Sequence, residues 1–296
     1  MTVVIAGGSG FLGRKLARRL ESQGHRVITL TRRPSPDPSY VTWNPDGEAG
    51  TLSPHLEGVD AIVNLAGEGI ADKRWSESRM RALRDSRLLS TRTLVRAIAA
   101  CARPPQALIS GSAIGYYGPH GDEAVTEATP PGTNFLARLC VEWEQEAQAA
   151  ASPATRVAIV RTGLALDGKE GALARMLLPF KLGLGATLGS GRQFMPWVHV
   201  DDWTSVVAWL AASGQSGPFN ATAPEPVTNR EFTRTLAAVL RRPAVFRAPA
   251  FVLQAALGEL SSVLLEGQRV LPARATQLGF KFVHHHLEPA LRSLNL

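Results

Sequence analysis

Glycines with the spacing of a phosphate-binding turn stand near the start of the chain. Gly7, Gly10 and Gly13 follow the β-branched run Val3-Val4-Ile5, and leucines at helical spacing come after them. Where a buried strand turns into a helix, such glycines let backbone N–H groups approach a pyrophosphate, which then faces the helix N-terminus. The alternative is a plain strand-to-helix turn without a ligand. The place of the glycines favours a nucleotide site.

Two arginines end the second predicted strand, which covers residues 26–30 and leads into Thr31-Arg32-Arg33. A fold that selects NAD usually places an acidic residue about 20 positions beyond the glycines, where it holds the ribose 2′-hydroxyl. An arginine there accommodates a 2′-phosphate instead. We therefore expect Arg32 and Arg33 to favour NADP(H), the alternative being a solvated basic loop.

The elements that position these residues alternate between strand and helix. Strands are expected at residues 2–6, 26–30, 40–43, 60–65, 107–110 and 157–161, and helices at 12–20, 73–100 and 135–150. This alternation predicts an α/β fold with a doubly wound parallel sheet over residues 1–165, completed by elements within 195–225. Leu65 and Ala66 end a strand at the edge where such folds contact cofactors.

The alternation weakens in the second half of the chain. Residues 166–296 are expected to form a smaller substrate-side region over the carboxyl edge of the sheet, with a C-terminal domain at about 245–296. Helices are predicted at residues 172–182, 201–212, 229–240, 251–265 and 288–294, and short strands at 196–200 and 219–221.

Composition and charge narrow the class of protein. The 296 residues are 45% hydrophobic and 19% charged, with a net charge of +7. The basic residues come singly or in pairs and aromatic residues make up only 6%, which argues against a nucleic-acid partner. A dispersed basic surface or a pocket for phosphates explains the charge equally well.

The cysteines and the lengths of the apolar runs indicate where in the cell the protein is expected. Cys101 and Cys140 form neither a zinc pattern nor a disulfide framework, and we expect both to be reduced. Met1 leads directly into the first strand, so we expect no signal peptide and a cytoplasmic location. The longest apolar run, at about residues 248–258, is too short to span a bilayer, and no membrane partner is expected.

Several longer motifs stand in a characteristic order along the chain. They read Asn64-Leu65-Ala66-Gly67-Glu68, Gly111-Ser112-Ala113-Ile114-Gly115-Tyr116-Tyr117-Gly118, Trp143-Glu144, Arg161-Thr162-Gly163, Pro196-Trp197-Val198-His199-Val200-Asp201-Asp202 and Leu265-Glu266-Gly267-Gln268. With the first glycines, they resemble the extended short-chain dehydrogenase/reductases, and more narrowly the atypical "epimerase family" proteins, which carry a small C-terminal domain of unknown function. The resemblance implies a Rossmann-like fold and an NADP-binding site.

The resemblance also implies a catalytic serine, which by position is Ser112, and a tyrosine followed four residues later by a lysine. That pair is absent. The three tyrosines are Tyr40, Tyr116 and Tyr117, and Asn44, His120 and Gly121 stand four positions beyond them. Phe135 and Leu139 are expected at the family's tyrosine and lysine positions. An unassisted phenol, with a pKa near ~10, is a poor base at neutral pH.

We therefore take Ser112, Tyr116 and Tyr117 as the catalytic candidates, acting as hydrogen-bond donors to a developing oxyanion rather than as bases. The resemblance places Arg87 on the helix that passes the diphosphate. The expected cofactor-binding residues are Gly7, Gly10, Phe11, Leu12, Gly13, Arg32, Arg33, Leu65, Ala66, Arg87 and Gly163.

Other polar residues have two interpretations. His199, Asp201 and Asp202 have the types for acid–base or metal chemistry, but such a group at a strand end more often caps a helix, and we expect no metal. The run 284–286, three histidines, is expected to be a solvated turn. Glu68 either reaches the cleft or lies at the surface.

Two functions remain open. The first is an NADP(H)-dependent oxidoreductase or epimerase/dehydratase acting on a small substrate of sugar- or nucleotide-linked type. The second is a non-catalytic NADP(H)-binding regulator or scaffold, which the missing tyrosine–lysine pair favours. A homodimer is left open as the assembly.

Overall fold

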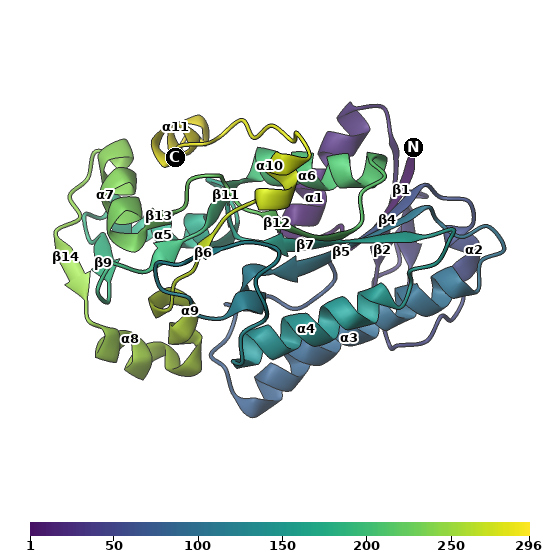
Figure 1. Ribbon diagram of the computed structural model, residues 1–296, viewed down its shortest axis with the longest axis horizontal. Coiled ribbons are helices and arrows are strands. Elements are labelled where there is room, and N and C mark those ends of the chain that lie inside the picture. The colour runs from purple at the N-terminus through teal and green to yellow at the C-terminus, as the bar shows by residue number, and fades with distance from the viewer.

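A seven-stranded parallel sheet forms the centre of the computed structural model, which describes residues 1–296. Its strands are β1 (Thr2–Ala6), β2 (Arg26–Thr31), β3 (Tyr40–Thr42), β4 (Ala61–Asn64), β5 (Ala107–Ala113), β7 (Arg156–Thr162) and β12 (Gly217–Ala221). They lie in the order β12-β7-β5-β4-β1-β2-β3, so the direction of winding reverses between β1 and β4. The predicted α/β, doubly wound sheet is confirmed (Figure 1).

Helices cover both faces of the sheet (Figure 1). One face packs against α1 (Phe11–Ser22) and α6 (Val200–Ala212) through a core cluster of 22 buried residues. The other packs against α2 (Ser53–Leu56), α3 (Glu77–Ala99) and α4 (Phe135–Gln148). Helix α3 begins four residues later than residue 73, the predicted start, because the Ser76 side chain caps it by accepting the Arg79 N–H.

The remaining elements form a second body beside the sheet. They are η1 (Ile114–Tyr117), β6 (Ala124–Val125), β8 (Leu164–Leu166), α5 (Gly171–Lys181), β9 (Ala186–Leu188), β10 (Phe194–Met195), β11 (Trp197–His199), β13 (Val227–Thr228), α7 (Asn229–Leu240), β14 (Phe246–Ala248), α8 (Ala250–Leu257), η2 (Gly258–Ser261), α9 (Ser262–Leu265), β15 (Arg269–Val270), α10 (Ala273–Gln277) and α11 (Leu287–Ser293). A separate core cluster that includes Trp197, Phe232 and Leu236 joins β8, α5, β11, α7 and α11 within this body. None of the helices combines the length and the apolar composition that a membrane crossing requires.

The C-terminal residues are tied to the rest of the chain rather than standing apart. Strand β15 pairs with β6, α10 packs on β12, and α11 packs on α7. The single helix predicted over residues 251–265 is wrong, because Gly258, at φ +60°, interrupts it between α8 and η2. The domain boundary at residue 165 stays a prediction.

The glycine turn between β1 and α1 is packed so tightly that two of its positions exclude a side chain. Gly7 has φ +78°, and a Cβ there would lie 2.6 Å from the Leu65 carbonyl oxygen. A Cβ on Gly13 would lie 2.3 Å from the Gly7 carbonyl oxygen. Gly10 differs: it is exposed, has φ −77° and ψ 171°, and would place a Cβ 3.2 Å from the same oxygen.

A histidine pair fastens the C-terminal segment to α6. His199 caps the helix, in place of the Asp201 or Asp202 that the sequence pattern predicts, by accepting the Asp201 N–H on Nδ1 at 3.1 Å. Its ring stacks on His284 at 3.7 Å between centroids. The buried Asp202 carboxylate accepts the N–H groups of Val283 and His284 at 2.9 and 2.8 Å. The expectation of a solvated turn is therefore wrong for His284, which this carboxylate holds in place.

The partners of His199 fix its neutral form. Nδ1 is an acceptor, and Nε2 lies 3.2 Å from the Ser293 hydroxyl, which itself donates to the Ala290 carbonyl. Burial, and after it the adjacent His284, lower the pKa of His199, against the opposing charges of Asp201, Asp202 and Asp167. Protonation would remove the acceptor that caps α6.

Alanine substitutions at the tightly packed Gly13 and the exposed Gly10 should destabilise the protein to different extents. Gly13→Ala should lower the free energy of unfolding by roughly 1–3 kcal/mol, because the new Cβ meets backbone atoms that cannot move aside. Gly10→Ala should cost under about 1 kcal/mol, because its backbone conformation suits any residue. Urea unfolding of both variants measures this, and equal losses would contradict the geometry.

The neutral His199 makes stability depend on pH. Because its pKa is lower in the folded than in the unfolded chain, the unfolded state binds more protons below about pH 6.5, and stability falls as pH decreases through that value. His199→Asn keeps a capping oxygen and removes the titration, so its melting temperature should fall less between about pH 7.5 and pH 5.5. His55→Asn, at an exposed histidine, is the control and should follow the wild type. Parallel curves for all three proteins would refute the assignment.

Candidate functional site

The carboxyl ends of the central strands bring the predicted residues to one edge of the sheet. In the parallel register Ala6 lies beside Asn64, Asn64 beside Ser110, and Ser112 beside Arg161. The glycine turn, the Leu65–Ala66 segment and Ser112 therefore follow neighbouring strands at the point where the winding reverses. In sheets of this kind, ligands bind outside that edge.

The start of α1 offers unused hydrogen-bond donors. The backbone N–H groups of Phe11, Leu12 and Gly13 have no partner within the chain, whereas the Gly10 N–H donates to the Gly7 carbonyl at 3.0 Å. No side chain caps the helix at Gly10. Donors of this kind at a helix N-terminus, beside a glycine-rich turn, fit an anion such as a pyrophosphate.

Contacts that the sequence analysis missed tie this helix start to the second body. The Arg14 guanidinium donates to the Ser9 carbonyl and pairs with Glu170, and Lys15 pairs with Asp167. Both carboxylates belong to the loop between β8 and α5. No pattern in the sequence links these positions, since the ion pairs join residues far apart in the chain.

The two arginines that follow β2 are free. Arg32 and Arg33 are exposed, and neither guanidinium forms an ion pair or a hydrogen bond within the protein. The Arg33 N–H donates to the Thr31 hydroxyl at 3.1 Å, which fixes the backbone where the strand ends. Both side chains are therefore available to an anionic group.

Arg87 braces the loop after β4. Its guanidinium donates to the Leu83 carbonyl at 2.9 Å and to the Glu68 carbonyl at 3.0 Å, and lies 5.3 Å from the centre of the Trp143 ring. Burial lowers the pKa of Arg87. The Glu68 carboxylate pairs with the buried Arg79. Arg87 thus lies beside the loop predicted to contact the cofactor, and two of its N–H groups already donate to backbone carbonyls.

Gly163 has a packing role in the structure. A Cβ at this position would lie 2.4 Å from the Pro196 carbonyl oxygen and 2.9 Å from the Thr222 methyl carbon. The glycine therefore allows the chain after β7 to approach the segment before β11, whether or not a ligand lies nearby.

A buried polar network surrounds Ser112. The Ser112 hydroxyl, in a residue only 4% exposed, donates to Glu144 Oε1 at 2.6 Å. Arg161, 3% exposed, donates to both Glu144 oxygens at 2.9 and 2.8 Å. The network thereby joins β5, α4 and β7. Glu144 belongs to a motif that the resemblance quoted, but its role was not predicted.

The charges in this network offset one another. Burial alone would lower the pKa of Arg161, but the hydrogen bonds and charge of Glu144 raise it further than burial lowers it. Arg161 is therefore charged throughout the physiological range. Because the Ser112 hydroxyl donates its hydrogen bond to Glu144, Ser112 Oγ can only accept a hydrogen bond from a ligand.

The two adjacent tyrosines occupy different environments. Tyr117 is fully buried, and its hydroxyl donates to Asn220 Oδ1 at 2.6 Å and accepts from Arg161 at 2.9 Å. Burial raises the pKa of Tyr117 to about 12. The Tyr116 ring covers the Arg161 guanidinium at 3.4 Å, and its half-buried hydroxyl has no partner within the protein.

Helix α4 presents no tyrosine–lysine pair at this site. Phe135 packs edge-on against Trp75, with ring centroids 5.5 Å apart, and Leu139 is buried. Cys140, one turn before Glu144, points its thiol toward the Ala113 carbonyl, and burial raises its pKa to about 11. A thiol in this state is neutral and is no substitute base.

Comparison with known proteins agrees with the fold. The family model "NAD dependent epimerase/dehydratase family" matches residues 3–222, and a domain of unknown function, DUF1731, matches residues 248–294. "Epimerase family protein Mb2239" of Mycobacterium bovis is 41% identical over 98% of this chain and 96% of its own length.

Two solved structures are similar over nearly the whole chain. The crystal structure of human epimerase family protein SDR39U1 with NADPH is 36% identical, has a TM-score of 0.92 and is matched over 99% of each chain. A structure from Corynebacterium glutamicum titled nucleoside-diphosphate sugar epimerase is 33% identical, with a TM-score of 0.82, over 99% of this chain and 58% of that one. With a parallel sheet, a glycine turn and these relatives, the chain belongs to the NAD-dependent epimerase/dehydratase family.

Proposed function

We propose that the protein binds NADP(H) at the carboxyl edge of the sheet and acts as an oxidoreductase or epimerase/dehydratase on a small substrate. The observation that carries this proposal is the glycine turn, where the N–H groups of Phe11, Leu12 and Gly13 at the start of α1 have no partner within the protein. The human relative that was crystallised with NADPH supports the choice of cofactor.

Each predicted cofactor residue except Gly163, which has a packing role, takes part in this proposal. Gly7, Gly10 and Gly13, with the N–H groups of Phe11 and Leu12, hold the pyrophosphate. The free guanidinium groups of Arg32 and Arg33 hold the 2′-phosphate. Leu65 and Ala66 line the edge beside the turn, and Arg87 supports the loop that follows them. When bound, NADP(H) supplies the site with a hydride donor or acceptor.

The substrate side rests on Ser112 and Tyr116. Because the Ser112 hydroxyl donates its hydrogen bond to Glu144, we propose that Ser112 accepts a hydrogen bond from a substrate hydroxyl, rather than donating to an oxyanion as the sequence alone suggested. The unpartnered Tyr116 hydroxyl donates to the reacting oxygen. Tyr117 is a positioning residue, since its hydroxyl is committed to Arg161 and Asn220.

One observation favours the non-catalytic alternative. The Glu144 carboxylate is paired with Arg161 and accepts a hydrogen bond from Ser112, so the network presents no unpaired carboxylate to a substrate. A protein that holds NADP(H) without turnover would have the same cofactor turn and a closed polar network. Turnover on a panel of alcohol and carbonyl substrates separates the two functions.

NADPH should bind more tightly than NADH. Arg32→Glu should weaken NADPH by about tenfold or more, because it removes a charge-assisted hydrogen bond and adds repulsion, while NADH should change far less. Arg26→Glu is the control, because Arg26 is the exposed first residue of β2 and lies at the opposite end of the strand from Arg32. It should change neither affinity by more than about twofold. Titration calorimetry measures all six affinities, those of NADPH and NADH for the wild type and both variants. A wild type without preference for NADPH would refute the role of the arginines.

Phenylalanine substitutions should distinguish the adjacent tyrosines. Tyr117→Phe should lower the free energy of unfolding by about 1–3 kcal/mol, because it leaves buried groups on Arg161 and Asn220 without a partner. Tyr116→Phe should change stability by under about 0.5 kcal/mol and reduce turnover. Chemical unfolding and NADPH oxidation rates test both, with Ser112→Ala as the inactive reference. Full activity in Tyr116→Phe and Ser112→Ala would show that the site is wrong.

A further inference from the structure

A second pocket, which shares no residue with the glycine turn, lies between the chain after β5, the β9–β10 loop, the start of α7 and β15. Its volume is about 320 Å³. Arg192, Arg230 and Arg269 line it together with Asp122, and Phe194 provides an apolar wall. These residues are far apart in the sequence, so the tertiary structure assembles the pocket.

The charges of this pocket are not balanced. None of its three arginines forms an ion pair within the protein. The Arg230 guanidinium donates a hydrogen bond to the Ser190 carbonyl at 3.3 Å. Three positive charges and the one carboxylate of Asp122 leave a formal charge of +2. All three arginines are exposed, so solvent weakens their mutual repulsion, and an anion between them would remove what is left of it.

Close backbone contacts fix the walls on which the arginines stand. The Arg230 N–H donates to the Gly191 carbonyl at 2.9 Å, and a Cβ on Gly191 would lie 2.4 Å from the Thr187 methyl carbon. A Cβ on Gly267 would lie 2.4 Å from the Phe194 nitrogen. The loop, the helix start and the C-terminal segment are therefore locked together, which limits the ordering that a ligand must impose.

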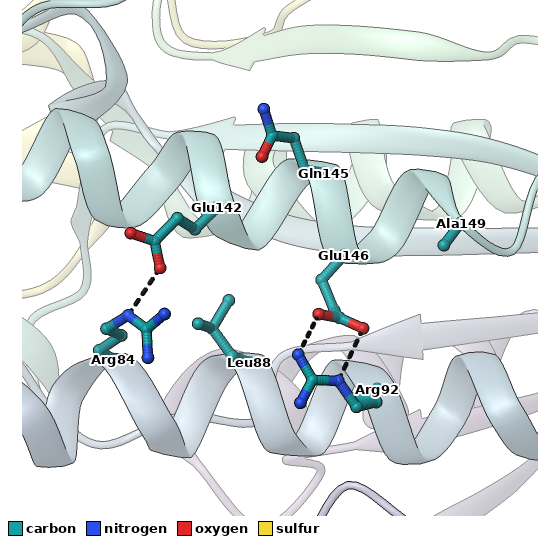
Figure 2. Close-up of a pocket in the computed structure, with 7 residues that line it drawn as sticks. All are labelled: Arg84, Leu88, Arg92, Glu142, Gln145, Glu146 and Ala149. Atoms are coloured by element: carbon teal, nitrogen blue, oxygen red, sulfur yellow. Dashed lines mark hydrogen bonds and ion pairs between the residues drawn. The ribbon is translucent and has the colours of Figure 1, made fainter.

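A pocket of similar size between α3 and α4 shows the contrast (Figure 2). There Arg84 pairs with Glu142 at 2.6 Å and Arg92 pairs with Glu146 at 2.7 Å. Each arginine facing that pocket already has a carboxylate partner. The pocket of Arg192, Arg230 and Arg269 has the same kind of cation without the counter-charge.

We propose that the pocket of Arg192, Arg230 and Arg269 binds the phosphoryl group of a small phosphorylated molecule. A guanidinium binds phosphate oxygens through paired N–H donors, and a phosphate monoester dianion or a diphosphate matches a charge of +2 better than a single carboxylate does. The volume accommodates a group larger than one phosphate, and Phe194 offers an apolar surface to the part attached to it. Arg269 gives the C-terminal segment a direct part in ligand binding.

Inorganic pyrophosphate is the probe, titrated by calorimetry into the full chain saturated with NADPH so that the glycine turn is not available to it. The variant Arg192→Gln/Arg230→Gln/Arg269→Gln should weaken pyrophosphate by roughly tenfold or more. The matched control Arg84→Gln/Arg92→Gln should bind as the wild type does. Asp122→Asn should tighten binding, because it removes the one negative charge. Circular dichroism confirms that each variant is folded, and Arg269→Gln alone replaces the triple variant if that one is not.

The outcomes separate the alternatives. Absence of pyrophosphate binding to the wild type, or equal weakening in the triple variant and its control, would overturn the proposal. Citrate binding as tightly as pyrophosphate would overturn the phosphoryl assignment in favour of any polyanion, and orthophosphate shows whether one phosphate suffices. If NADPH itself does not bind, the same variants titrated without it still test this pocket, so its failure and that of the proposed function are distinguishable.

Discussion

The buried ion pair between Arg161 and Glu144 is the interaction on which the site depends. It joins β7 to α4, and Glu144 accepts a hydrogen bond from Ser112 on β5. Arg161 also donates to Tyr117, whose hydroxyl donates to Asn220 on β12. Removing one partner of such a pair leaves a buried charge without compensation, at a cost of about 3–5 kcal/mol. The network therefore ties together the elements whose ends form the site, and because the Ser112 hydroxyl donates to Glu144, Ser112 meets a ligand as an acceptor.

A second constraint is the close approach of backbones around glycines. At Gly13 the helix start touches the end of β1, and at Gly163 the chain leaving β7 touches the segment before β11. The first contact fixes α1 against the sheet, and the second brings the second body to the carboxyl end of β7. The histidine pair of His199 and His284 then fastens the last residues to α6, so that the C-terminal segment adds to the walls of a pocket instead of trailing from the fold.

The positive charge of the chain divides into two kinds of arginine. On α3, arginines face carboxylates of α4 and are neutralised. At Arg32 and Arg33, and around the pocket of Arg192, Arg230 and Arg269, they have no such partner. A pocket for phosphates and a dispersed basic surface were equal explanations of the +7 charge from composition. The location of the unpaired arginines gives the first explanation a structural basis in this chain.

The sequence by itself determined the sheet, the glycine turn and the family, because strand and helix periodicity and turn glycines are local signals that a short window contains. It also located Ser112 at the end of a central strand. It did not show that the Ser112 hydroxyl donates to Glu144, that Tyr117 is buried while Tyr116 is half-buried, or that His284 stacks on His199. It also could not tell the unpaired Arg269 from the paired Arg92. Those properties depend on which distant residues meet, and only the tertiary structure decides that, because burial and charge pairing are set by packing between elements rather than by neighbours in the chain.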